Sequence, residues 1–195
     1  MFRPLLLIGH SEHELKLDNK AINDAIMSRK DIRLSEKEGA TFTEDTYLPK
    51  KVPAVTELLE AVDTLIQKEV HPLMETFNSW GHILMPGEST MFHSHTVLGK
   101  PPGMSWVYYS EVPKSSGNLV FTFEACTKRV FTEVEPKVGK LVLFPDYVPH
   151  FTKRNNSEDR RISISGNAMI PEAKMKELDS VGIHSLLNYI GIFAG

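Results

Sequence analysis

Cysteine is nearly absent from this sequence of 195 residues, since Cys126 is the only one. A single cysteine excludes a disulfide bond within the chain and fits a reducing compartment. No apolar stretch approaches the roughly 20 residues that a membrane-spanning helix requires. The short apolar run from Leu5 to Ile8 is also too brief for the core of a secretory signal peptide. We therefore expect a cytoplasmic protein with no membrane partner.

A strong charge of one sign is missing as well. The chain carries 22 Lys and Arg against 25 Asp and Glu, a formal net charge of -3. This balance gives no sign of a nucleic-acid partner. Hydrophobic residues make up 41% and charged residues 24%, which is typical of a soluble globular protein. Repeats, low-complexity tracts and linkers are absent from the sequence. We therefore expect one domain, residues 1–195.

Three parts of this domain differ in pattern. Residues 1–79 are predicted to form an N-terminal strand at Met1–Ile8, a polar connection at Ser35–Pro49, and supporting helices. The helices are expected at Asn19–Ser28 and Pro53–Phe77. The second has apolar residues at helical spacing, and Pro72 should kink it or split it near Val70. Residues 80–170 are the predicted β core. Residues 171–195 read as a helical tail with an apolar end, which would dock on the core or on a second copy in a homodimer.

The β core shows many short alternating runs with turn signals between them. Without intervening helices, such runs favour a barrel or jelly roll, so the fold is predicted to be mainly β with flanking helices. The strands are expected at Trp80–Met85, Ser89–His95, Met104–Val112, Asn118–Glu124, Arg129–Val134, Lys140–Phe144 and Arg161–Ile170.

Three histidines in this core suggest a metal site. His93 and His95 stand two residues apart, so on a strand they point to the same face. His150 lies several predicted strands later and would complete a set of three imidazoles, which favours iron, zinc or copper over magnesium or calcium. Downstream, Arg161 offers a planar cation suited to a carboxylate. The alternative is that the histidines are surface and loop residues without a metal.

The region from Trp80 to Asn167 resembles the iron(II)- and 2-oxoglutarate-dependent oxygenases, in particular a small group common in bacteria and phages. The motifs that carry the resemblance are Trp80-Gly81-His82, Gly87, His93-Ser94-His95, residues 106–109, Val112-Pro113, residues 116–121, residues 135–145, Pro149-His150 and residues 161–167. The resemblance implies a double-stranded β-helix that uses Fe(II), 2-oxoglutarate and O2. The prolyl 4-hydroxylases are the nearest widely known relatives.

The resemblance also implies roles for single residues. Arg161 and Ser163 match the pair that binds the distal carboxylate of 2-oxoglutarate, and Tyr109 matches a tyrosine near that carboxylate. His82, on an inner strand two residues after Trp80, is a further candidate for a polar contact with 2-oxoglutarate. His93, His95 and His150 match the metal ligands. His95 stands where the wider superfamily carries Asp or Glu, so the ligand set departs from the usual one.

The implied activity is a dioxygenase, in the form of a hydroxylase. It would couple decarboxylation of 2-oxoglutarate to succinate with oxidation of a small molecule, an amino acid or a peptide, including a prolyl one. Two alternatives stay open. A cupin-type metal enzyme has the same barrel and does not require Arg161-x-Ser163. A non-enzymatic β-barrel binding module would hold no metal.

Overall fold

The computed structural model of the chain describes residues 9–35, 39–43, 52–96, 103–125 and 128–174. The strand expected at Met1–Ile8 and nearly all of the expected helical tail lie outside these residues. The described elements are β1 (Ser11–Glu14), α1 (Asn19–Met27), β2 (Ile32–Ser35), β3 (Ala40–Thr43), α2 (Pro53–Glu69), β4 (Glu75–Leu84), β5 (Met104–Glu111), β6 (Leu119–Ala125), β7 (Lys128–Val134), β8 (Lys140–Pro145), β9 (His150–Thr152) and β10 (Arg161–Met169).

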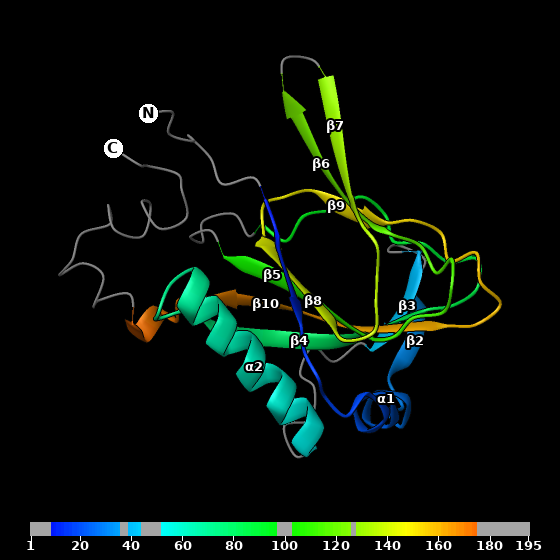
Figure 1. The fold of residues 1–195 in the computed structure, drawn as a ribbon, viewed down its shortest axis with the longest axis horizontal. Coiled ribbons are helices and arrows are strands. Elements are labelled where there is room, and N and C mark those ends of the chain that lie inside the picture. Colours follow the sequence, from blue (N-terminus) through cyan, green and yellow to red (C-terminus); the bar gives the residue numbers. More distant parts are fainter. Residues whose placement is uncertain (1–8, 36–38, 44–51, 97–102, 126–127, 175–195) are drawn as a thin grey trace.

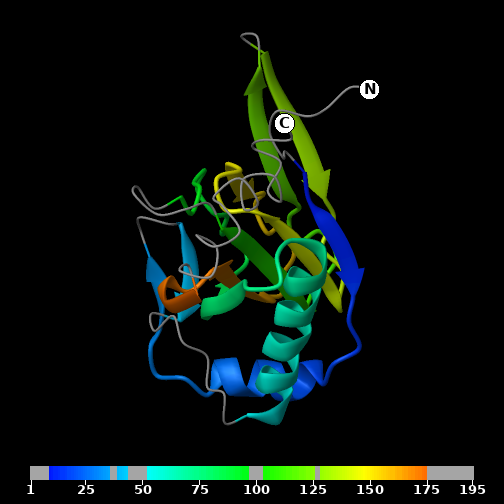
Figure 2. The ribbon, with the colours of Figure 1, turned by 90° about the vertical axis from the view of Figure 1, so that its left-hand side faces the viewer.

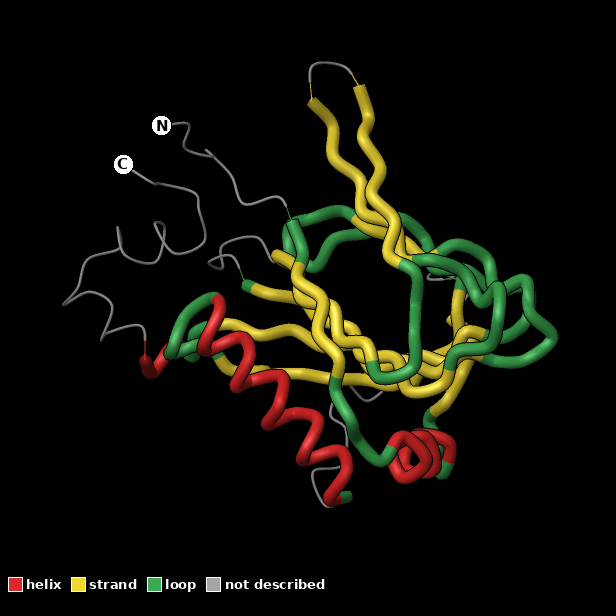
Figure 3. Tube along the Cα trace, in the orientation of Figure 1, coloured by secondary structure: helices red, strands yellow, loops and turns green. Residues whose placement is uncertain are grey.

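Two antiparallel sheets make up the body of the molecule (Figures 1 and 3). The larger has seven strands in the order β1-β8-β5-β10-β4-β3-β2, and the smaller has three in the order β7-β6-β9. The β6–β7 hairpin projects away from the rest of the molecule (Figure 1). The prediction of a mainly β fold with flanking helices is confirmed.

Both helices pack on one face of the large sheet, opposite the small sheet (Figure 2). Their apolar stripes join inward residues of β4, β5, β8 and β10 in a single buried cluster. Burial of such side chains, at roughly 25 cal/mol per Å² of apolar surface, is the main force that holds the helices to the sheet. In the described part of the chain, neither helix is long and apolar enough to cross a membrane.

The helix expected at Pro53–Phe77 is shorter than predicted. It begins at Pro53, where a helix can lack an N–H donor, and ends at Glu69, with Val70 as its C-cap. Pro72 cannot continue the helical hydrogen bonds, so the helix ends before it and is neither kinked nor split into two helices. Phe77, which the prediction placed on the helix, lies in β4 with 41% of its surface exposed.

Two further expectations were wrong. Residues 35–49 contain β3, which pairs with β2 on one side and β4 on the other. Ser89–His95 is not a strand, because its cross-strand pairing is limited to an isolated bridge between His93 and His150. Around that bridge, the Thr90 and His95 amides donate to carbonyls of Thr152 and Asp146.

The inner face of β10 sets the layout of the site. Alternate residues of β10 lie between partners on β5 and β4, which gives three rows of side chains across three strands. The rows are Tyr109–Ser163–His82, Val107–Ser165–Trp80 and Ser105–Asn167–Asn78. The outer-facing Ile162 and Ile164 belong to the core under the helices. β10 therefore separates the apolar core under the helices from the face whose side chains line the site.

Candidate metal centre and anion pocket

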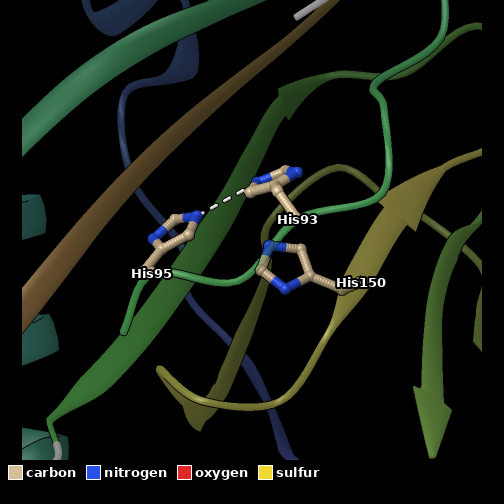
Figure 4. Close-up of side chains that lie close together, drawn as sticks. All are labelled: His93, His95 and His150. Atoms are coloured by element: carbon tan, nitrogen blue, oxygen red, sulfur yellow. Dashed lines mark hydrogen bonds between the residues drawn. The ribbon is translucent and has the colours of Figure 1, made fainter. Parts of the chain in front are cut away.

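His93, His95 and His150 converge on one point (Figure 4). One nitrogen from each ring lies within 4.8 Å of the others. Two backbone hydrogen bonds hold His93 to His150, from each amide to the other residue's carbonyl, at 3.0 and 2.9 Å. The predicted grouping of the three histidines is thus present, although the first two stand on an irregular segment and only His150 opens a strand.

Each histidine is oriented by a hydrogen bond at its other nitrogen. The Nδ1 atom of His93 lies 2.7 Å from the Met91 carbonyl oxygen, and that of His150 lies 2.9 Å from the Val148 carbonyl oxygen. The Nδ1 atom of His95 lies 2.6 Å from Oδ1 of Asn167. Because these oxygens only accept, Nδ1 carries the proton in each ring and donates it. The three Nε2 atoms keep their lone pairs, as metal-binding histidines require.

The spacing of these lone pairs fits a bound cation. The Nε2 atoms of His93 and His95 lie 3.1 Å apart (Figure 4). Two adjacent nitrogen ligands at ~2.1 Å from one ion, at right angles to each other, lie roughly 3.0 Å apart. Two lone pairs at this distance repel each other unless a proton or a metal ion lies between them. The residues present therefore suit a divalent metal.

His150 is the most buried of the three, with 5% of its surface exposed. Burial, followed by the charges of His93 and His95, lowers the pKa of His150 to about 3. The ring is packed edge-on against Phe144, at 4.8 Å between centroids. It is therefore neutral near pH 7, the form that binds metal.

Arg161 lies in the same pocket as a buried cation. Its side chain is 1% exposed, and its Nη1 donates to the Gly117 carbonyl at 2.9 Å and the Ser116 carbonyl at 3.4 Å. Among the described residues no carboxylate lies within ion-pair distance of it, and its Nε has no hydrogen-bond partner. Burial lowers the pKa of Arg161, with Tyr109 opposing the shift. A buried guanidinium with a free donor is suited to an anionic ligand.

The first row of side chains surrounds this cation. Ser163 is fully buried and its Oγ has no hydrogen-bond partner, while the Tyr109 ring centroid lies 5.4 Å from Cζ of Arg161. Burial raises the pKa of Tyr109, and it lowers the pKa of His82 to about 3 with help from the charge of Arg161. Both side chains are therefore neutral near pH 7. The four residues predicted to contact 2-oxoglutarate, called the anchor residues below, therefore line one pocket: His82, Tyr109, Arg161 and Ser163.

That pocket is a cavity of about 380 Å³ between the sheets, which the histidines also line. Trp80 packs against His95, with ring centroids 5.8 Å apart, and Phe42 and Leu119 add apolar walls. Among the described residues that line the cavity, Arg161 is the only Lys or Arg, and Asp and Glu are absent. The cavity thus joins a three-nitrogen centre to an unpaired cation.

Sequence reasoning gave no role to Asn167, Asn78 or Ser105, which surround His95. Asn167 belongs to a motif quoted above, but an amide in a strand has no distinctive spacing. Only the pairing of β10 with β4 and β5 shows that these residues meet.

Residues 78–167 match the family described as "Putative 2OG-Fe(II) oxygenase", and this segment contains the three histidines and all four anchor residues. No match was found among curated protein sequences.

Solved structures show the same fold. A prolyl-4-hydroxylase from Pseudomonas putida has a TM-score of 0.65 and 23% identity, over 84% of this chain and 93% of that one. A Trichoplax adhaerens prolyl hydroxylase, solved with a peptide fragment of hypoxia inducible factor, has a TM-score of 0.64 and 15% identity, over 89% and 87%. HygX from Streptomyces hygroscopicus, solved with nickel and 2-oxoglutarate, has a TM-score of 0.63 and 10% identity, over 82% of each chain.

These neighbours establish the predicted double-stranded β-helix. The matched family uses Fe(II), 2-oxoglutarate and O2, and the three Nε2 atoms together with the free donors of Arg161 and Ser163 are suited to the first two. Residues 78–167 thus match the 2OG-Fe(II) oxygenase family, and the chain has the fold of the prolyl hydroxylases.

Proposed function

We propose that the chain is an Fe(II)- and 2-oxoglutarate-dependent hydroxylase that acts on a small molecule, an amino acid or a peptide, with a prolyl side chain as one candidate. The observation that carries the proposal is that one cavity holds three inward Nε2 atoms and a buried arginine that has no ion-pair partner among the described residues. A metal and a dianion would complete both parts of that cavity.

Each part of the cavity has a task. His93, His95 and His150 would hold the metal through Nε2, which the hydrogen bonds at Nδ1 leave available. When bound, Fe(II) supplies activation of O2, coupled to decarboxylation of 2-oxoglutarate to succinate. Arg161 and Ser163 would hold the distal carboxylate of 2-oxoglutarate, since their free Nε and Oγ donors lie in the same buried corner.

Tyr109 and His82 would complete this corner as neutral groups. Neither adds a charge that would compete with the carboxylate for Arg161. The Tyr109 ring and Leu119 also shield the corner from solvent, which strengthens a charged hydrogen bond within it. The protein's contribution is thus to orient the dianion and to keep water from its anchor.

The experiment that tests the proposal is anaerobic titration of the Fe(II)-loaded protein with 2-oxoglutarate, followed by visible absorption. We expect a weak metal-to-ligand charge-transfer band that saturates at one equivalent of 2-oxoglutarate. Bound iron without the band would refute the role of 2-oxoglutarate and favour the cupin-type alternative. Absence of bound metal would favour the binding module.

Hydroxylation is tested separately, in the presence of O2. Succinate formed from 2-oxoglutarate is measured with and without prolyl peptides or free amino acids, and the products are weighed by mass spectrometry. We expect a hydroxylase to add one oxygen atom to the substrate that stimulates succinate formation. Stimulation without added oxygen would point to another oxidation.

A further inference from the structure

His95 differs from the other two histidines in what holds its ring. His93 and His150 donate from Nδ1 to backbone carbonyls two residues earlier, at Met91 and Val148, which remain whatever the nearby side chains are. His95 instead donates to a side chain 72 residues away, Oδ1 of Asn167, at 2.6 Å. The Nδ1 hydrogen bond of this one histidine therefore depends on a side chain from a distant strand and not on its own backbone.

The direction of the Asn167 amide is itself fixed. Oδ1 of Asn78 accepts from the backbone N–H of Asn167 at 3.1 Å and from its side-chain Nδ2 at 3.0 Å. A backbone N–H can only donate, so Asn78 must present its oxygen there. The nitrogen of the Asn167 amide consequently faces Asn78, and its oxygen faces His95.

Ser105 completes the set from the other side of β10. Its hydroxyl donates to Oδ1 of Asn167 at 2.8 Å and lies 3.2 Å from Nδ1 of His95. Ser105, Asn167 and Asn78 are direct neighbours across β5, β10 and β4, so sheet register places all three. The two side chains that hold the Asn167 amide against His95 are thus both provided by neighbouring strands of the large sheet.

We propose that Asn167, held by Asn78, is a positioning residue that keeps His95 in the Nδ1–H form and directs its Nε2 to the metal. This rests on the metal centre proposed above. An amide oxygen is an uncharged acceptor, so it orients the His95 ring through Nδ1 without adding a charge beside the metal centre. The chain thus holds a third neutral ligand at the position where the superfamily uses a carboxylate.

The first test is the tautomer of His95 in metal-free protein. With [15N]histidine labelling at pH 8, where imidazole is neutral, long-range 15N–1H spectra distinguish Nδ1–H from Nε2–H rings. We expect Nδ1–H for His95 in the wild type and a shift to Nε2–H in Asn167→Leu. A His95 ring that stays Nδ1–H in Asn167→Leu would overturn the proposal.

The second test is Co(II) affinity, followed by ligand-field absorption under anaerobic conditions. Loss of a hydrogen bond to a metal-binding histidine costs about 10- to 100-fold in metal affinity, which we expect for Asn167→Leu. Asn78→Leu should act in the same direction, while Asn78→Asp keeps the accepting oxygen and should retain wild-type affinity. Asn155→Ala is the control, because it removes buried hydrogen bonds to the Leu84 and Asp159 carbonyls at a residue that does not line the cavity.

The possible outcomes distinguish a failure of the metal centre from a failure of the role of Asn167. Wild-type protein that binds no Co(II) would overturn the metal centre itself. Wild-type binding with unchanged affinity in Asn167→Leu would overturn only the role of Asn167. If Asn167→Leu does not fold, equal affinity of Asn78→Leu and Asn78→Asp overturns the proposal, and a loss confined to Asn78→Leu supports it. Reduced affinity in Asn155→Ala would show that general destabilisation, and not the amide, controls metal binding.

Discussion

Replacement of Arg161 by glutamine tests the anion pocket most directly. Arg161 is buried without an ion-pair partner among the described residues, so the carboxylate of a bound dianion would be its main counter-charge. Truncation of one member of a buried hydrogen-bonded charge pair costs about 2–5 kcal/mol. At about 1.4 kcal/mol for each tenfold change, we expect Arg161→Gln to weaken 2-oxoglutarate binding by about 30- to 4,000-fold.

The assay is thermal unfolding of the metal-loaded protein with and without 2-oxoglutarate. A ligand at 100 times its Kd stabilises the fold by about 2.7 kcal/mol. For a protein of this size, each kcal/mol raises Tm by about 2–4 °C, so the wild type should gain about 5–11 °C. At the same concentration, a 30-fold weaker Kd leaves less than about 1 kcal/mol, and a gain below about 4 °C.

Arg160, directly before β10, supplies the matched control. Its Nε lies 3.3 Å from Oε1 of Glu111, and the side chain does not line the cavity. Arg160→Gln therefore makes the same chemical change outside the pocket. We expect the full wild-type gain in Tm from this variant. A full gain in Arg161→Gln as well would refute the assignment of Arg161 as the anchor.

Three further predictions concern the histidines. His150→Ala should fold but lose stoichiometric metal binding, as measured by metal analysis after gel filtration. The control His13→Ala, on β1 beside Glu69, should keep its metal. Metal retained in His150→Ala would contradict the assignment of the three histidines as ligands. His82 is neutral when folded, so its depressed pKa of about 3 destabilises the fold as pH falls below the unfolded value near 6.5. Between pH 7 and 5 this lowers the free energy of unfolding of the metal-free wild type by about 2 kcal/mol. In urea unfolding, His82→Gln should therefore lose about 2 kcal/mol less than the wild type between these two pH values. Equal losses in both proteins would refute the prediction. His95→Asp restores a carboxylate and should keep metal that His95→Ala loses, as measured by Co(II) titration; metal lost from both would place the third ligand elsewhere.

Local patterns were enough to predict the elements whose burial repeats along the chain. The apolar stripe of α2 reflects one face turned to a core, and the apolar runs of β5 and β8 reflect burial on both faces of the sheet, so both patterns can be read from the sequence. The four residues of β3 form a strand because β2 and β4 lie on either side of it. Such pairing depends on distant residues, so a short polar segment gives little local sign of it.

The site shows the same division between local and distant information. The three histidines and Arg161 have uncommon side-chain chemistry, and order along the chain was enough to group them. The irregular backbone around His93 follows from its bridge to His150, 57 residues away, and could not be read from the alternation of residues 89–95. Asn167 acts only through its register with Asn78 and Ser105, which is a property of the sheet and not of any one strand.

The neutral ligand set changes the charge of the whole cavity. With a divalent ion on three neutral imidazoles, the ion and Arg161 together carry three positive charges, and no described lining residue is acidic. A dianion leaves one positive charge uncompensated, whereas the usual carboxylate ligand would leave none. Two unit charges 4 Å apart interact by about 4 kcal/mol at an effective dielectric constant near 20. A substrate with a positive charge near the metal would therefore be disfavoured, and a neutral or anionic one is better suited to this cavity than lysine or arginine.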